Sequence, residues 1–159
     1  MHAMTLLSRV GLVSLGCLLL VGCGGGNTAD VSGTVTMDGE PLEGAIVMFM
    51  PESTGGSGGR PASAVTDAEG NYELVYGRGA TGAVPGTYQV SIRTYRSPNE
   101  DAETPEEKAG RDETVPARYN ADTELVETVE ADGGVIDFEL SSEGEIKLPP
   151  GAGGGYGGY

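Results

Sequence analysis

Residues 31–50, VSGTVTMDGEPLEGAIVMFM, decide the fold. In residues 31–37, valine, glycine and methionine alternate with serine and threonine, which is the period-two pattern of a strand with one buried face. Asp38 and Gly39 accept positive φ angles and predict a tight reversal. Pro41 has no N–H to donate, so we expect residues 40–43 to stay outside the sheet. Residues 45–50 are apolar on both faces, which predicts a central, covered strand. The stretch therefore predicts a hairpin from which the core is built.

Further runs carry strand signals and are separated by turn residues. They cover residues 62–66, 71–76, 87–95, 123–130 and 135–140. In the fourth run the alternation slips, because Leu125 and Val126 are adjacent, and we expect a β-bulge there. Seven strands with no convincing helix predict an all-β fold, a seven-stranded antiparallel β-sandwich. The alternation places these side chains in one core: Val35, Val47, Tyr88, Val90, Ile92, Phe138 and Leu140.

Three segments between the strands are polar or glycine-rich. Residues 51–61 and 77–84 are glycine-rich loops, and residues 96–115 hold seven acids, three bases and no periodic apolar face. We interpret this last segment as a solvated insert, with a partner-binding acidic loop as the alternative. Asp67, Glu69 and Asn71 alternate as calcium ligands do, but the glycine and distal glutamate of a helix-loop-helix calcium site are missing. We therefore expect an Asx-type turn that closes a hairpin.

Several of these motifs resemble the carboxypeptidase regulatory-like domains, which are small transthyretin-like β-sandwiches of secreted bacterial proteins. The resemblance rests on G-x-V-x-x-D-G-x-P-L-x-G-A-x-V at residues 33–47, on TDAEGNYEL at 66–74 and on VPGTYQV at 84–90. It covers roughly residues 30–140 and implies a non-catalytic role. Residues 116–120 are similar to the element that precedes a strand in this family, and we expect Tyr119 to pack on the sandwich edge.

The N-terminus predicts export and lipid attachment. Arg9 precedes an apolar run at residues 10–21, which is shorter than the ~20 residues that span a bilayer. The run ends in Leu-Val-Gly-Cys23, which resembles the lipobox of bacterial lipoproteins, in which the cysteine sulfur is diacylated after cleavage before it. Cys17 lacks the aliphatic residue at the first position of that motif. An ordinary signal peptide or an uncleaved anchor, with Cys23 incidental, is the alternative.

These motifs divide the chain into four parts. They are a signal peptide at 1–22, the lipidated Cys23 with a flexible tether at 23–29, the sandwich at 30–140 with its insert at 96–115, and a disordered Gly/Tyr-rich tail at 141–159. The six residues after Cys23 reach at most ~20 Å, so the domain stays close to the lipid surface. The partner of this anchor is a membrane of the cell envelope. Gly24 in place of the aspartate of inner-membrane lipoproteins favours the outer membrane in a Gram-negative cell.

Charge and residue content limit the chemistry of the mature chain. The formal net charge is −15, from 24 acids and nine bases, and it becomes about −16 once Arg9 is removed. This field repels nucleic acid, so no nucleic acid partner is expected. The only histidine is His2, within the signal, which excludes Ser-His and Cys-His nucleophile systems and the usual zinc sites. We expect no catalytic, metal or cofactor residue.

The sequence therefore predicts a membrane-anchored, non-catalytic binding or structural module of the cell envelope. The partner is an envelope protein or polysaccharide that the sequence does not identify, contacted through loops or an exposed strand edge. The alternative is a carboxylate-only hydrolase or a calcium-dependent carbohydrate-binding protein on the same sandwich.

Overall fold

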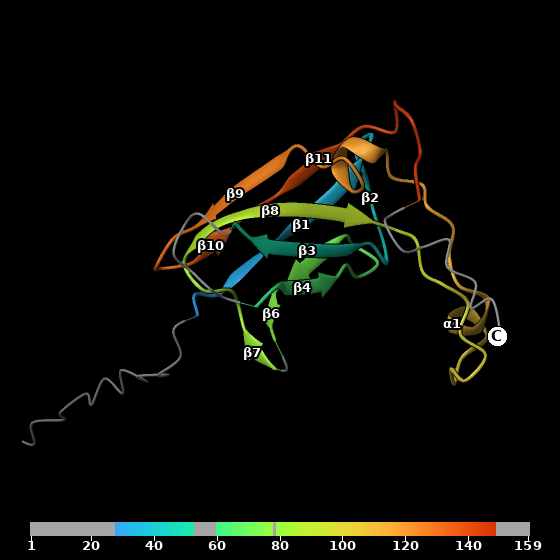
Figure 1. The fold of residues 1–159 in the computed structure, drawn as a ribbon, viewed down its shortest axis with the longest axis horizontal. Coiled ribbons are helices and arrows are strands. Elements are labelled where there is room, and N and C mark those ends of the chain that lie inside the picture. The colour runs from blue at the N-terminus through green and yellow to red at the C-terminus, as the bar shows by residue number, and fades with distance from the viewer. Residues whose placement is uncertain (1–27, 53–59, 78, 149–159) are drawn as a thin grey trace, which may run out of the picture.

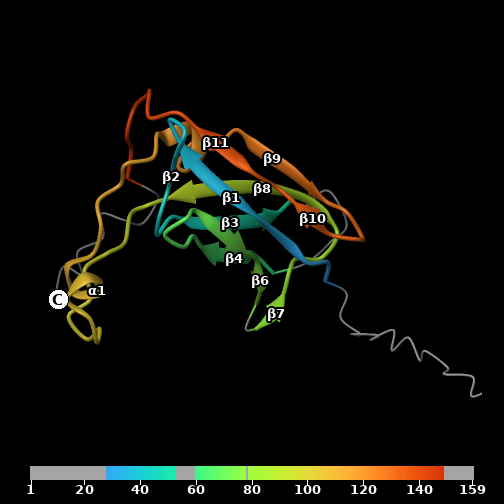
Figure 2. The same ribbon diagram turned by 180° about the vertical axis from the view of Figure 1, so that it is seen from behind.

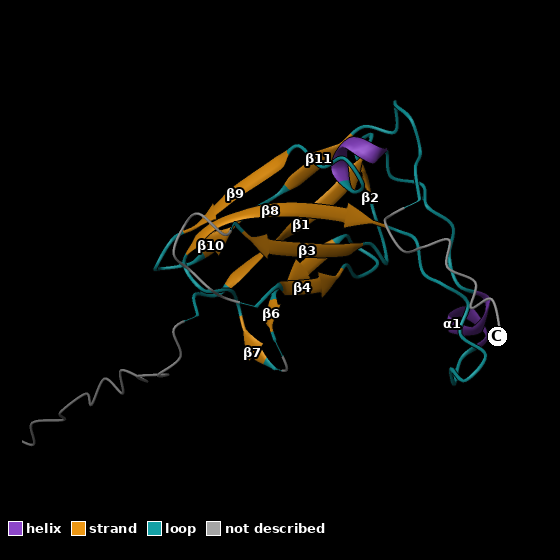
Figure 3. Ribbon diagram, viewed as in Figure 1, coloured by secondary structure: helices purple, strands orange, loops and turns teal. Residues whose placement is uncertain are grey.

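The computed structural model describes residues 28–52, 60–77 and 79–148. Over these residues the protein is all-β, with two sheets stacked as layers (Figure 1). Strand dominates the secondary structure, and the helical elements are short (Figure 3). The signal peptide, Cys23 and most of the tether, most of the loop at 51–61 and the end of the tail lie outside the described residues.

The first sheet is built around β1 (Val31–Met37), which lies in front when the molecule is seen from behind (Figure 2). Along one edge β1 pairs antiparallel with β2 (Glu40–Pro41) and β5 (Asn71–Glu73). Along the other edge it pairs with β10 (Gly134–Val135) and β11 (Phe138–Leu140). These last two pairings are parallel, so the expectation of a purely antiparallel sandwich is wrong. Almost the whole domain separates these strands in sequence, and no tight turn forces them to run in opposite directions.

The second sheet has six strands, all paired antiparallel. Their order is β7 (Ala80–Thr81), β6 (Val75–Tyr76), β4 (Ala62–Val65), β3 (Ile46–Pro51), β8 (Gly86–Arg93) and β9 (Leu125–Val129). β3 is central in this sheet, as residues 45–50 predicted. Its outward side is only half covered, however, and Met50 is 43% exposed. Continuous apolar sequence at β3 therefore reflects one buried face and one partly open face.

The predicted hairpin between residues 31–37 and 45–50 is wrong in its pairing, because β1 and β3 lie in different sheets. Asp38 (φ 53°) and Gly39 (φ 85°) do reverse the chain, but onto β2, which the sequence placed outside the sheet. Pro41 is tolerated there because it occupies a position whose N–H does not point at the partner strand. The N–H of Leu42, one residue later, donates to the oxygen of Val35 at 3.0 Å.

The run at residues 71–76 is divided between the two sheets, since β5 pairs with β1 and β6 pairs with β4. The Asx turn before it is confirmed: Asp67 Oδ1 accepts the N–H groups of Glu69 (3.0 Å) and Asn71 (2.8 Å). It carries the chain from one sheet to the other instead of closing a simple hairpin. The run at 135–140 is divided into two strands of one sheet, β10 and β11, and β7 adds a short strand inside the loop at 77–84.

The bulge expected in residues 123–130 is absent. β9 follows β8 in continuous register from Gly86 opposite Val129 to Val90 opposite Leu125. Val126 faces outward and is 53% exposed, while Val129 is buried. An apolar residue on the outer side of the sheet, and not an extra residue, explains the apparent slip in alternation.

The core lies between the two sheets and contains all seven side chains that the alternation placed there. The core contains three aromatic contacts. The Phe49 ring lies 5.7 Å from Tyr88 of its own sheet and 6.3 Å from Phe138 of the other sheet, and Tyr72 stacks 6.2 Å from Phe138. Tyr119, in the 3-10 helix η1 (Ala117–Tyr119), packs partly buried against this core, as expected.

Three boundaries differ from those expected. Val115 is fully buried in the core, so the end of the predicted insert belongs to the sandwich. Ala29, expected in the tether, is 6% exposed and bridges Ala83. The predicted disordered tail begins too early, because residues 141–148 pack on the domain: the N–H of Ser142 donates to Asp38 Oδ1 at 3.0 Å, and the Glu145 oxygen accepts the N–H of Ala117 at 2.8 Å. Backbone hydrogen bonds hold these segments without requiring an apolar sequence pattern.

Candidate binding surfaces

The insert stands on a rigid base formed around Glu113. This carboxylate is 8% exposed, and its Oε1 accepts the N–H of Thr94 at 2.9 Å, the Thr94 hydroxyl at 3.0 Å and the N–H of Val115 at 3.0 Å. The Thr94 hydroxyl oxygen in turn accepts the N–H of Thr114 at 2.8 Å. A buried carboxylate is tolerated when several donors surround it. Glu113 therefore fastens the end of β8 to the chain that leaves the insert.

Two arginines close the base of the insert next to Gly44. Arg96 and Arg111 exchange two backbone hydrogen bonds of 2.9 Å. Their side chains reach across to the 43–44 turn, with Arg96 Nη2 2.8 Å from the Gly44 oxygen and Arg111 Nη1 2.7 Å from the Glu43 oxygen. Gly44 has φ 67°, which favours glycine, and a Cβ there would lie 2.5 Å from Arg111 Nη1 and displace the end of that side chain.

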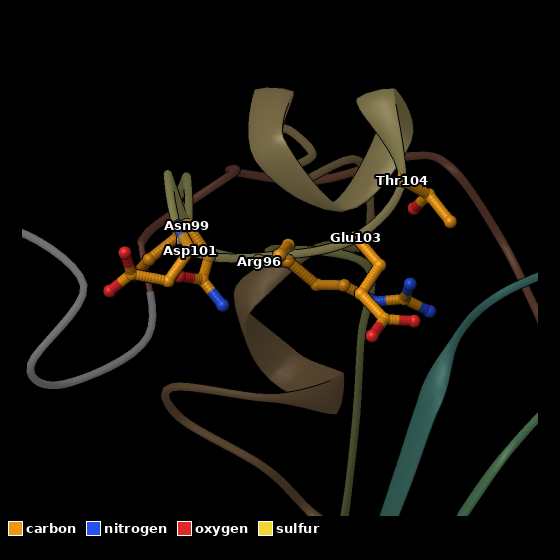
Figure 4. A pocket seen from close by; sticks show the side chains of 7 residues that line it. Arg96, Asn99, Asp101, Glu103 and Thr104 are labelled. Carbon is orange, nitrogen blue, oxygen red and sulfur yellow. Dashed lines mark hydrogen bonds between the residues drawn. The ribbon is translucent and has the colours of Figure 1, made fainter.

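Beyond this base the insert projects from one end of the sandwich and carries α1 (Pro105–Ala109) (Figure 1). It encloses an open hollow of about 610 Å³. Figure 4 shows Asn99 and Asp101 on one side of the hollow and the side chains of Arg96 and Glu103 on the other. These groups can hydrogen-bond a polar ligand. Ser97 is the serine that lines the hollow, and its hydroxyl could act as a nucleophile. Among the residues that line the hollow, no imidazole or thiol is present to activate it.

The outward side of the six-stranded sheet carries six apolar residues among polar ones and no acid. We call it the apolar face, and its apolar members are Ile46, Met48, Met50, Val65, Val75 and Val126. Four of them are 40–55% exposed. Strand register places them in rows, such as Met50, Gln89 and Val126 on three neighbouring strands. The other outward-facing residues of β3, β4, β6, β8 and β9 are serine, threonine and glutamine, with Arg93 as the one charged residue.

The outward side of the five-stranded sheet is different in charge, and we call it the acidic face. Glu73 lies opposite Ser32, and Glu139 lies opposite Thr36. The Asp137 carboxylate lies between them and accepts the N–H and the hydroxyl of Thr34 at 2.8 and 2.9 Å. The protein thus gathers acids on one broad side and points none outward from the strands of the other.

Acids at the turns have structural hydrogen-bond partners. Side-chain and backbone hydrogen bonds from Asn71 lower the pKa of Asp67, and those from Ser142 lower the pKa of Asp38. Among residues 28–52, 60–77 and 79–148, no group of three or more His, Cys, Asp or Glu side chains is placed to hold a metal ion. The Asp67 turn thus matches the structural interpretation of its alternating acids and not the calcium-loop one.

The predicted lipidation residue, Cys23, lies outside the described residues. In the part of the chain that the structure describes, no helix is long and apolar enough to cross a membrane. The sequence analysis missed the apolar face, because both sides of β3 were interpreted as covered. The exposed valine at position 126, which disturbed the alternation of β9, was the signal that could have revealed it.

The comparisons with known proteins provide no functional assignment. No family model and no curated protein matches the chain. Among solved structures, the chain is similar to a 9R-lipoxygenase from Cyanothece PCC8801, with 11% identity and a TM-score of 0.34. The match covers 72% of this chain and 16% of the lipoxygenase chain. A likeness this distant carries no argument about activity.

Proposed function

We propose that this protein is a lipoprotein of the cell envelope whose sandwich binds a partner without catalysing a reaction. In this proposal the signal at 1–22 is removed, Cys23 is acylated, and acyl chains hold the domain at a membrane, the outer membrane in a Gram-negative cell. The domain is a carboxypeptidase regulatory-like, transthyretin-like sandwich. The sequence motifs at residues 33–47, 66–74 and 84–90 support this family, and the two stacked sheets of the structure are compatible with it.

One observation carries the binding role: the two sheets present outer faces of opposite character. No acid points outward from the strands of the apolar face, although the chain has 24 acids. Exposed apolar residues gathered on one face of a soluble domain are typical of interaction sites. Among the described residues, most carboxylates lie on the acidic face, at turns or in the insert, and Glu113 is buried among hydrogen-bond donors.

The direction of the insert agrees with an anchored module. The start of the described chain, ahead of β1, lies at one end of the molecule, and the insert with α1 lies at the other end (Figures 1 and 2). An anchor at Cys23 would therefore direct the hollow lined by Arg96 and Glu103 away from the membrane. The apolar face and the acidic face would then stand at the sides of the molecule.

The experiment is a paired screen of the purified protein for turnover and for binding. Esters, glycosides, peptides and phosphoesters are tested as substrates, while envelope proteins and polysaccharides are tested as ligands in the same buffer. We expect saturable binding and no turnover. Because the chain is strongly acidic, association with a basic partner should weaken as salt is raised. Turnover that survives purification and disappears when one carboxylate pair is mutated would contradict the proposal.

Calcium tests the alternative of a calcium-dependent protein. A ligand that binds only the folded state raises the melting temperature, so thermal unfolding is followed with and without calcium. We expect no calcium-specific rise beyond the effect of magnesium at the same concentration, which serves as the control for charge screening. A large rise with calcium alone would favour the alternative.

A further inference from the structure

We infer that the apolar face is a contact between two copies of this chain anchored in the same membrane. The inference deepens the proposed binding function and rests on anchorage at Cys23. The partner of the apolar face is a second copy of the protein. The insert and the acidic face take no part in that contact.

The distribution of charge favours the apolar face as the contact. Two copies with a net charge near −15 each repel one another, and the repulsion is strongest where acids meet acids. A contact through the acidic face would place Glu73, Asp137 and Glu139 of both copies together. No acid points outward from the strands of the apolar face, since Glu127 of β9 lies opposite Tyr88 on the core side, and acids flank the face where strands end, as at Glu52 and Glu130. This face is the broad sheet surface on which two copies can meet with the least repulsion.

The composition of the apolar face also favours a contact there. Val126 and Val65 are 53% and 55% exposed, and Met48 lies half-buried between them on the central strand. Burial of exposed valine and methionine side chains against a second apolar surface is favourable. An apolar centre with charged residues at its rim is also the usual organisation of a protein–protein contact. A basic partner, by contrast, would be attracted to the acidic face and the insert.

The position of the proposed anchor determines how the apolar face is oriented. The strands β3, β4, β8 and β9 run approximately along the direction from the start of the described chain to the insert (Figure 1). With Cys23 in the membrane, the apolar face stands at the side of the domain, where a neighbouring anchored copy lies. Only residues 24–27 separate Cys23 from the first described residue, so the domain stays within roughly 20 Å of the lipid surface. Two copies are thus held at similar heights with their apolar faces able to meet.

The size of the apolar face predicts the strength of the contact. Five neighbouring strands at ~4.8 Å spacing and about five residues of ~3.4 Å rise give a face of roughly 300–400 Å². This is small compared with a stable interface of about 800 Å² per partner, so we expect weak, reversible association in dilute solution. Confinement to one membrane raises the effective concentration and compensates for the small area.

The test is cysteine cross-linking of the full chain in intact envelopes. In the mature lipoprotein Cys17 has been removed and the Cys23 sulfur is acylated, so the unmodified chain is the blank. Gln89→Cys places a thiol in the apolar face between Met50 and Val126. Val135→Cys is the matched control, because Val135 is 71% exposed and lies on the acidic face. A short bis-maleimide is added, and the mass of each cross-linked band is determined.

We expect a band at twice the protomer mass for Gln89→Cys and little for Val135→Cys or the blank. Adding Met50→Glu and Val126→Glu to Gln89→Cys should lower the dimer fraction about tenfold, because it places acids in the contact. Equal dimer from Val135→Cys, or none from Gln89→Cys, would overturn the inference. A Gln89→Cys adduct with a different protein would also overturn it, but would leave the proposed binding function standing. Failure of that function would be seen instead as turnover in the substrate screen.

Discussion

Phe138 connects the two sheets at the level of a single side chain. It lies on β11 of the five-stranded sheet, and its ring contacts Phe49 of the six-stranded sheet and Tyr72 of its own sheet. Its exposed fraction is 5%. Removing this ring leaves a cavity between the layers, and neighbouring rings on both sides lose their contacts.

We therefore expect Phe138→Ala to lower the free energy of unfolding by about 3–5 kcal/mol. Urea denaturation measures the change, and Val135→Ala is the control, since that side chain is 71% exposed and its loss should cost about 0.5 kcal/mol or less. A loss under about half a kilocalorie for Phe138→Ala would mean that β11 does not close the core.

Because Tyr72 is buried, the free energy of unfolding depends on pH in the alkaline range. Its hydroxyl donates to the Ile136 oxygen at 2.6 Å. Burial, and then the negative charges of Asp137 and Glu127, raise the pKa of Tyr72 above its ordinary value of 10.0. The folded state therefore keeps this proton at a pH where the unfolded chain has lost it. The contribution of Tyr72 is complete below pH 10 and is lost as the pH rises above that value.

Urea unfolding from pH 8 to about 11.5 tests this dependence. We expect Tyr72→Phe to be less stable at neutral pH by about 1 kcal/mol, because it lacks the hydrogen bond to Ile136, and to decline less steeply above pH 10 than the unmodified protein. Some decline should persist, since burial also raises the pKa of Tyr88. Parallel declines in the two proteins would contradict the assignment to Tyr72.

At the level of elements, the insert separates into a removable part and a structural part. Residues 97–110 lie beyond the paired backbones of Arg96 and Arg111. Replacing Pro98–Ala109 with a short Gly/Ser linker should leave the cooperative thermal transition almost unchanged, because the closure entropy of a surface loop varies slowly with its length.

The contrasting change is a substitution at the base. Glu113→Ala leaves the N–H groups of Thr94 and Val115 without the acceptor they now share, and we expect a loss of at least about 2 kcal/mol in the free energy of unfolding. Differential scanning calorimetry of both variants decides the point. If the linker variant fails to fold while Glu113→Ala melts normally, the division of the insert is wrong.

The sequence predicted strand positions better than strand partners. Alternation located the strand runs and the inward residues of β1 and β8, because a side chain that faces the core must be apolar whichever sheet holds the strand. It could not reveal that β1 and β3 belong to different layers, because the same turn residues permit either a hairpin or a crossover. Pro41 was misjudged for a related reason: whether its missing N–H matters depends on the pairing register, which local sequence does not specify.

Site prediction had a different limit. The acids of the Asp67 turn could be assigned a structural role from sequence, because an aspartate that bonds the backbone two residues later is a local event. Val115 and residues 141–148 were assigned to polar segments, although tertiary contacts hold them on the domain. The apolar face was not foreseen either, since exposure of Met50 and Val126 depends on what covers the sheet. Global packing, and not residue pattern, decides these cases.

At the level of the whole molecule, the proposed anchor would orient the other features. Acylation at Cys23 would place residue 28 near the lipid, direct the insert outward and turn the apolar face toward neighbouring copies (Figure 1). Two or three acyl chains would also make attachment lasting, since each buried CH₂ contributes about 0.8 kcal/mol. An unacylated protein could carry the same sandwich but would have no fixed orientation.

The intact mass of the mature protein purified from membranes tests this anchorage most directly. We predict a mature N-terminus at Cys23, with a mass increment of a diacylglyceryl group and, where the amine is also modified, a third acyl chain. Cys23→Ser should abolish the increment, whereas Cys17→Ser should leave it unchanged. A mature chain that still contains Cys17, or one that begins at Cys23 without any acyl increment, would contradict the account.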